Sequence, residues 1–111
     1  MKLQWRLVAR GLKPTLQFRR RLVQRVRQLE MLLVRFPHDT VQLQVQLRKQ
    51  PRRQSFEVDL MLWLPTKSLR AKKTGPEGFL VLDAAFQVLV REVGIMKSSS
   101  RLETNWRRFA Q

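Results

Sequence analysis

The chain has 111 residues, which is enough for one compact domain and too few for two. Hydrophobic residues make up 43% of it, a share that supports an ordinary core and argues against a disordered protein. Lys and Arg number 23 against 8 Asp and Glu, which gives a formal net charge of +15. A domain this basic is typical of proteins that bind a polyanion, either nucleic acid or an anionic membrane surface.

The sequence lacks the residue patterns of several functional classes. Cysteine is absent, so disulfides and thiolate metal sites are excluded, and His38 beside Pro37 is interpreted as a turn residue. The sequence contains no metal-ligand spacing, Gly-rich phosphate loop or nucleophile with a spaced base. No apolar run has the length of a signal peptide or a membrane span. We therefore expect a cytoplasmic protein that is not an enzyme, with no metal, cofactor, small-molecule substrate or membrane partner.

The first half of the chain predicts a strand followed by a long helix. Residues 2–9 alternate polar and apolar side chains, as a half-buried strand does. Thr15 is the predicted N-cap of a helix that runs to about Phe36, where Pro37 ends it. Apolar residues recur along this helix at intervals of three and four and form one stripe: Phe18, Leu22, Val26, Leu29, Leu33 and Phe36.

The middle of the chain predicts three strands. Residues 40–49 and 56–64 both alternate apolar and polar side chains, and the polar turn 50–54 between them indicates a hairpin. Residues 67–73 are interpreted as a short edge strand whose lysines discourage pairing with other chains.

A second helix and a tail complete the predicted order. Thr74 and Glu77 have the spacing of a capping box, and Gly94 is a predicted helix stop. The serines at 98–100 indicate a linker, so we expect a domain over 1–97 and a flexible basic tail over 98–111. The fold class is α/β (α+β), a β-α-β-β-β-α two-layer sandwich: a four-stranded mixed sheet with two helices on one face. The first strand should pair parallel with the second, and the later strands antiparallel.

The positive charge is concentrated in the first third of the chain. Residues 1–35 carry ten basic side chains against Glu30 alone. At about 100° per residue, Arg20, Arg27 and Arg35 fall opposite the apolar stripe of the first helix, and Arg21 and Arg25 flank it. A row of guanidiniums can address successive phosphates. The alternative is a solvated face, but such faces normally mix charges of both signs.

Other candidate residues have two interpretations each. Lys72 and Lys73 either contact RNA or only protect the sheet edge. Trp63 is either a stacking platform for a base or a partly buried residue on the open sheet face. The tail either folds on binding or stays disordered. Asp83 is interpreted as an isolated, favourable charge in the first half of its helix.

Several local sequences, in their order, resemble the ribosome hibernation-promoting factor family, which includes the ribosome-associated inhibitor proteins. Leu69-Arg70-Ala71, a Gly-containing turn and Phe79-Leu80-Val81-Leu82-Asp83 are similar to the family's edge strand and the start of its last helix. Leu89-Val90-Arg91-Glu92-Val93 follows in register, and Arg25 and Leu29-Glu30 match the first helix. The resemblance covers roughly residues 2–97 and corresponds to the short form of the family.

The resemblance implies a protein that binds ribosomal RNA of the small ribosomal subunit near the mRNA and tRNA channel and reversibly inhibits translation, as in hibernation or stress. Val88 and Ile95 stand where the family commonly has Lys, so the first helix is expected to supply more of the contact. The predicted rRNA-binding residues are Arg20, Arg21, Arg25, Arg27, Arg35, Lys72, Lys73, Arg91, Lys97 and Arg101. We expect a monomer when free.

Two other functions fit the sequence. A divergent member of this family could act as a protein-interaction regulator, for example by sigma factor modulation, because the second helix is not basic. A general binder of double-stranded RNA could use the same arginine row. Co-sedimentation with ribosomal particles separates these functions.

Overall fold

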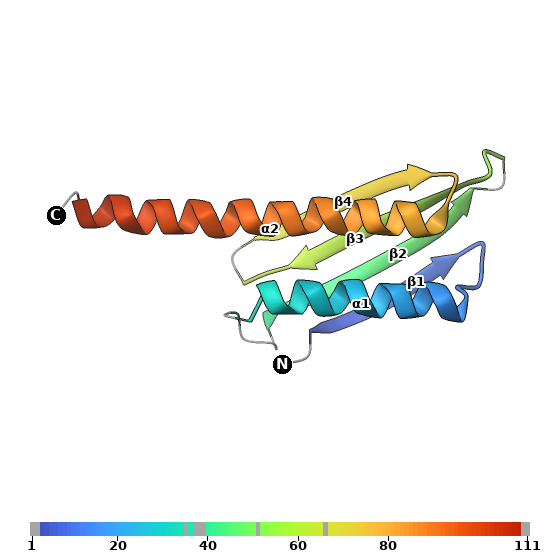
Figure 1. Ribbon diagram of the computed structural model, residues 1–111, viewed down its shortest axis with the longest axis horizontal. Coiled ribbons are helices and arrows are strands. Elements are labelled where there is room, and N and C mark those ends of the chain that lie inside the picture. The colour runs from blue at the N-terminus through green and yellow to red at the C-terminus, as the bar shows by residue number, and fades with distance from the viewer. Residues whose placement is uncertain (1–2, 35, 37–39, 51, 66, 110–111) are drawn as a thin grey trace.

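The computed structural model describes residues 3–34, 36, 40–50, 52–65 and 67–109, with side chains up to residue 97. Four strands and two helices follow one another in the predicted β-α-β-β-β-α order (Figure 1). They are β1 (Gln4–Arg10), α1 (Leu16–Leu32), β2 (Gln42–Gln50), β3 (Ser55–Trp63), β4 (Ser68–Gly75) and α2 (Gly78–Phe109).

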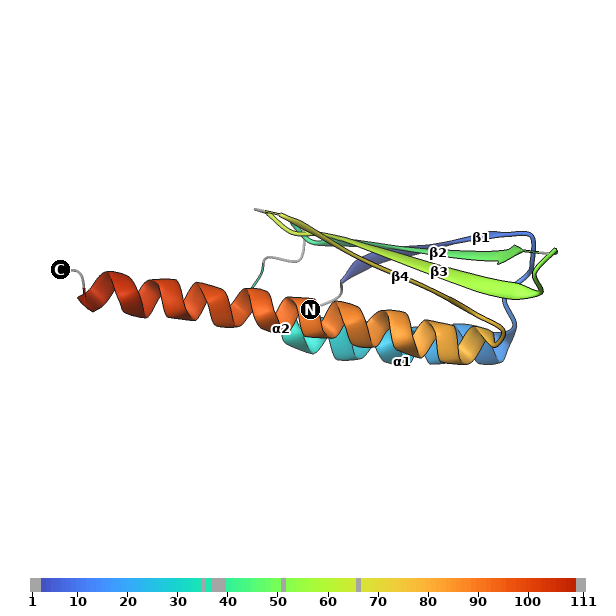
Figure 2. The same cartoon turned by 90° about the horizontal axis from the view of Figure 1, so that it is seen from above.

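The four strands form one sheet in the order β1-β2-β3-β4. β1 pairs parallel with β2, and β2–β3 and β3–β4 are antiparallel, as predicted. Both helices lie on one face of this sheet, and the other face is open (Figure 2). The predicted two-layer arrangement is therefore confirmed.

The core lies between the sheet and the two helices. On β2 the alternating residues Val41, Leu43, Val45 and Leu47 are all buried, because the period of two turns them to the same face. The predicted stripe of α1 meets them, and Leu22 and Leu29 are fully buried. Burying a side chain of this size contributes about 1.5–3 kcal/mol, so the apolar spacing fixes which face of each element turns inward.

The end of α1 differs from its predicted position. The helix ends at Leu32, and the backbone N–H of Leu33 donates to the carbonyl of Glu30 (3.0 Å), which tightens the last turn. The next turn is closed by a hydrogen bond from the Phe36 N–H to the Leu33 carbonyl (3.0 Å). Leu33 stays buried and Phe36 packs against the core, so their apolar spacing persists beyond the helix.

The predicted capping box at Thr74 is wrong. Thr74 and Gly75 extend β4 and pair with Glu57 and Phe56 of β3. The proline at 76 disfavours a helical conformation for Gly75, and the available strand partner favours an extended one. The first turn of α2 closes later, with a hydrogen bond from the Val81 N–H to the Glu77 carbonyl (3.0 Å).

The predicted stop at Gly94 is also wrong, because α2 continues through it to Phe109. Gly94 does not adopt the positive φ that a helix-ending glycine uses. The helical backbone also runs through the serines at 98–100, and α2 extends well past the sheet (Figure 1). That residues 98–111 act as a separate basic tail stays a prediction. Neither α1 nor the described length of α2 combines the length and the apolar character that a membrane span needs.

Candidate nucleic-acid interface

The outer face of α1 carries two arginines that point away from the core. Thr15 sets the start of the helix, because its hydroxyl accepts a hydrogen bond from the Phe18 N–H (3.1 Å). With Phe18 turned inward, Arg20 and Arg27 lie on the opposite side and are exposed. Neither of them forms an ion pair with any described residue. They are two helical turns apart, roughly 10.5 Å along the axis.

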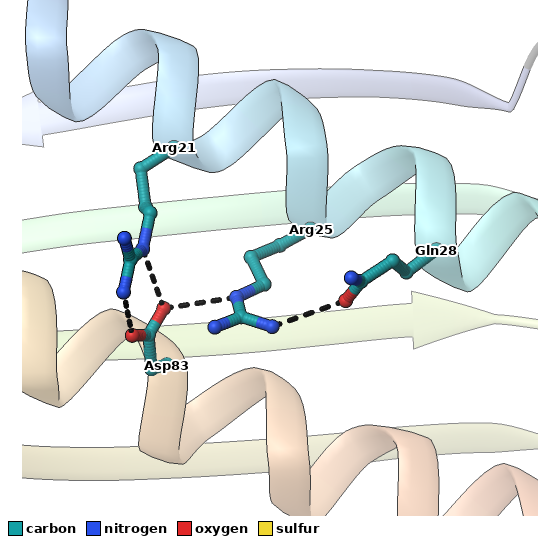
Figure 3. A network of polar contacts seen from close by, with 4 residues as sticks. All are labelled: Arg21, Arg25, Gln28 and Asp83. Atoms are coloured by element: carbon teal, nitrogen blue, oxygen red, sulfur yellow. Dashed lines mark hydrogen bonds and ion pairs between the residues drawn. The ribbon is translucent and has the colours of Figure 1, made fainter.

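Arg21 and Arg25 lie on the flank of α1 that faces α2, where they share one carboxylate. Arg21 donates through Nη2 to Asp83 Oδ2 (2.6 Å) and through Nε to Oδ1 (3.2 Å). Arg25 donates through Nε to Asp83 Oδ1 (2.9 Å) and through Nη1 to Gln28 Oε1 (3.1 Å), as Figure 3 shows. Asp83 therefore joins the two helices, and its interpretation as an isolated charge is wrong.

These contacts change the acidity of Asp83. The hydrogen bond from Arg21 lowers the pKa of the carboxyl from 3.8 to about 2, and Arg25 adds to this effect while partial burial opposes it. The carboxylate is therefore ionised at neutral pH and neutralises much of the local positive charge. Arg21 and Arg25 hold the helices together, and their contact with RNA stays a prediction.

Two of the predicted lysines also have partners within the molecule. Lys97 of α2 donates through Nζ to the carbonyl of Leu32 (2.8 Å), where a cation is favourable because it meets the negative end of the α1 dipole. Lys72 forms an ion pair with Glu57 (2.9 Å) and lies on the open face of the sheet. That face points away from the helices (Figure 2).

The open face of the sheet has further paired charges and a groove. Arg70 binds Asp59 through two hydrogen bonds of 2.7 and 3.0 Å. Near the start of β1, a groove of about 480 Å³ is lined by Gln4, Trp5, Arg6, Gln42, Leu43, Gln44 and Trp63. Trp63 is 41% exposed, which fits both a stacking platform and a partly buried residue. The described residues include no group of three or more His, Cys, Asp and Glu placed to hold a metal ion.

The remaining predicted residues lie in several places. Arg91 is exposed on α2, opposite the buried Leu89 and Val93. Lys73 is exposed on the edge strand β4. Arg35 lies outside the described residues, and Arg101 belongs to α2 but its side chain lies outside the description. Of the predicted set, Arg20, Arg27 and Arg91 share the outer surface of the helical layer, which we call the helix face.

Sequence reasoning missed two internal anchors and one group of cations. Glu30 accepts a hydrogen bond from the Leu3 N–H (2.8 Å) and so fixes the residues that lead into β1. Asp83 was placed on the correct helix but without its partners. The basic residues around the predicted turn 50–54 were not predicted to form a group, although positions 48–53 contain four of them: Arg48, Lys49, Arg52 and Arg53.

Comparison of the sequence with protein-family models and with curated proteins finds no match. Solved structures do match. A ribosomal subunit interface protein from Coxiella burnetii superimposes with a TM-score of 0.68 at 13% identity, covering 86% of this chain and 99% of that chain. The N-terminal domain of Protein Y from Thermus thermophilus superimposes with a TM-score of 0.65 at 18% identity, covering 84% and 96% of the two chains. At these identities the likeness establishes the fold: the chain folds as these two proteins do, as the resemblance to the hibernation-promoting factor family implied.

Proposed function

We propose that the chain binds the small ribosomal subunit near the mRNA and tRNA channel and reversibly inhibits translation, as in hibernation or the stress response. One observation carries the proposal. Arg20 and Arg27 are exposed on α1 and form no ion pair with any described residue, in a fold that is shared with a ribosomal subunit interface protein. The proposed mechanism is steric occlusion of the channel, with the attraction between cations and ribosomal RNA holding the protein in place.

The chemistry of the helix face suits an RNA partner that is recognised through its sugar-phosphate backbone. Arginine guanidiniums form charge-assisted and often bidentate hydrogen bonds with phosphates. Folded RNA presents phosphates and 2′-hydroxyls over a broad surface, and proteins recognise its helices mainly by shape. Base-reading side chains are therefore not required of this face.

The predicted contact residues differ in how free they are to bind. Arg20, Arg27 and Arg91 are the principal contacts in this proposal because they have no ion pair in the described part of the chain. Arg21 and Arg25 each keep one terminal nitrogen outside the described contacts, Nη1 and Nη2 respectively. Their contribution is secondary, because Asp83 offsets one of their two charges and holds both side chains in place. We further propose a cytoplasmic, monomeric protein without catalytic activity.

Co-sedimentation on a sucrose gradient tests the proposal. The parent chain should run with small subunits or 70S particles at low salt and leave them at high salt. The double variant Arg20→Gln with Arg27→Gln should lose this association by at least an order of magnitude while its thermal stability stays close to that of the parent. Arg70→Gln with Lys67→Gln removes the same number of charges from the start of β4 and its preceding loop, away from the helix face, and should keep the association. A parent chain that stays at the top of the gradient at low salt contradicts the proposal.

A protein-interaction regulator is the second candidate function. The α2 region over residues 75–96 has one basic residue, Arg91, against Glu77, Asp83 and Glu92, so this helix suits a protein partner better than a polyanion. A chain of this type would capture a protein, for example a sigma factor, and would not run with ribosomal particles. A general binder of double-stranded RNA would bind any duplex RNA as tightly as small subunits.

A further inference from the structure

We propose that the β2–β3 turn and the β1–α1 loop together form a second surface that binds the phosphate backbone of RNA. This inference rests on the proposed function and adds a second contact region to it. We call this surface the hairpin end, and it comprises six basic residues: Arg10, Lys13, Arg48, Lys49, Arg52 and Arg53.

The topology brings these residues together from three segments of the chain. Arg10 ends β1 and is the register partner of Arg48 on β2, because the two strands run parallel. Arg52 and Arg53 lie in the turn that links β2 to β3. The end of β1 and the β2–β3 turn lie at the same end of the molecule in both views (Figures 1 and 2).

The loop that carries Lys13 is held against the end of β2. Gly11 adopts a φ of +80°, a conformation that favours glycine. A Cβ atom at this position would lie 3.2 Å from the carbonyl oxygen of Lys49, so the backbone of the loop approaches β2 closely. Lys49 is itself positioned, because its Nζ lies 5.8 Å from the centre of the Phe56 ring in a cation–π contact. The hairpin end is therefore a defined arrangement of charges.

The six cations of the hairpin end are exposed and form no ion pair with any described residue. The nearby carboxylates are those of Glu57 and Glu77. Glu57 is the register partner of Arg48 but is bound to Lys72 and Gln50, so two acids lie among six bases. This end therefore differs from the open sheet face, where Asp59 and Glu57 balance Arg70 and Lys72.

The start of α1 adds to the positive potential of this end. α1 and α2 both begin here, and the rings of Phe18 and Phe79 in their first turns lie 5.9 Å apart. The first turn of α1 contains no acidic residue, whereas Glu77 stands at the start of α2, so it is the positive end of the α1 dipole that reinforces the cations. The charges come from three segments and do not converge on one pocket, because Lys13 and Arg53 line two different ones. This distribution suits an extended polyanion such as an RNA strand better than a single small anion.

The salt dependence of binding tests this surface. The variant Arg52→Gln with Arg53→Gln lowers the net charge from +15 to +13 at exposed positions of the turn. Binding of the full chain to isolated small subunits would be measured over a series of salt concentrations. Because each phosphate contact contributes about 0.7–0.9 to the slope of log K against log salt, the slope should fall by about 1.4–1.8. The matched control Arg70→Gln with Lys67→Gln has the same net charge, lies away from the hairpin end and should keep the parent slope.

The outcomes separate this inference from the proposed function. The slope of the turn variant could stay unchanged while Arg20→Gln with Arg27→Gln still loses binding. This result would overturn RNA binding by the hairpin end and leave the proposed function standing. An equal fall in the turn variant and in its control assigns the effect to net charge and also overturns it. A parent chain that does not bind small subunits at low salt refutes both. Cooperative unfolding with a melting temperature no lower than that of the parent shows that each variant is folded.

Discussion

Asp83 divides the arginines of α1 into two groups with different roles. Of the four arginines of α1 that were predicted to bind RNA, it binds Arg21 and Arg25 and leaves Arg20 and Arg27 without an ion pair to any described residue. The sequence predicted all four on the polar part of the helix, because helical spacing fixes their directions. It did not predict the division, since Asp83 lies 62 and 58 positions further along the chain and the pairing depends on how the two helices pack.

The variant Asp83→Asn tests the link between the helices. The pKa of Asp83 is lowered in the folded protein from 3.8 to about 2, so the ionised carboxylate stabilises the fold. This stabilisation is present above the ordinary pKa and is lost as the pH falls from about 4 to about 2. At pH 7 we expect the free energy of unfolding to fall by about 1 kcal/mol, a low value for charged hydrogen bonds because the pair is partly exposed.

Denaturant unfolding of the parent and the variant over this pH range measures the effect. The difference between the two proteins should be constant from pH 7 to about pH 5 and disappear near pH 2. A difference that stays constant down to pH 2 would show that the carboxylate does not carry the link.

At the level of elements, Gly94 shows that a local sequence pattern does not by itself determine where a helix ends. Glycine after an apolar stripe commonly ends a helix, and from sequence alone this position is typical of such a stop. In the structure the helix passes through Gly94. The preceding residue, Val93, is buried, and Lys97, three residues later, binds the end of α1. Contacts with the first helix therefore favour continuation, and these are not visible in a local pattern.

The substitution Gly94→Ala distinguishes a helix interior from a helix end. No neighbouring atom lies within 4 Å of the position that a Cβ would take. An alanine inside a helix should therefore raise the free energy of unfolding by about 0.5–1 kcal/mol. Thermal unfolding would measure the change, and a loss of stability would indicate a left-handed, helix-ending glycine.

Gly75→Ala provides the contrasting case. A Cβ at Gly75 would lie 3.0 Å from Cγ2 of Val81, a buried side chain at the start of α2. This variant should lose about 1 kcal/mol, because a packed core resists an added methyl group.

The elements themselves were largely predictable, and their ends were not. Alternation over 40–49 predicted β2 because Val41, Leu43, Val45 and Leu47 have to share one buried face. Thr74 and Glu77 matched a capping pattern, yet pairing with β3 kept Thr74 in a strand. Such pairing depends on a neighbour that only the assembled sheet provides, so boundaries follow from tertiary contacts.

At the level of the whole molecule, four of the described acids make contacts within the structure, whereas most of the described lysines and arginines form no ion pair. Asp83 joins the helices, and Asp59 and Glu57 bind Arg70 and Lys72 across the sheet. The net charge and the arginine row were predictable from composition and helical spacing. The hairpin end was not, because it depends on the parallel pairing that places Arg10 beside Arg48.

A molecule with this distribution of charge should respond to salt in two opposite directions. Its net charge of +15 is confined to a body measuring 59 × 27 × 18 Å, and self-repulsion of this kind destabilises a compact state. The screening length falls from about 30 Å at 0.01 M salt to about 8 Å at 0.15 M. Repulsion across the whole molecule should therefore act only at the lower concentration.

We expect the melting temperature to rise by several degrees as NaCl increases over this range, since about 1 kcal/mol corresponds to roughly 4–8 °C for a domain of this size. The surface ion pairs weaken at the same time, but each contributes little to stability. Binding to small subunits should weaken over the same range because counterion release drives it. The variant Arg52→Gln with Arg53→Gln should show a smaller rise in melting temperature, since its net charge is lower. A melting temperature that falls with NaCl would indicate that the ion pairs dominate over the repulsion between the unpaired arginines and lysines.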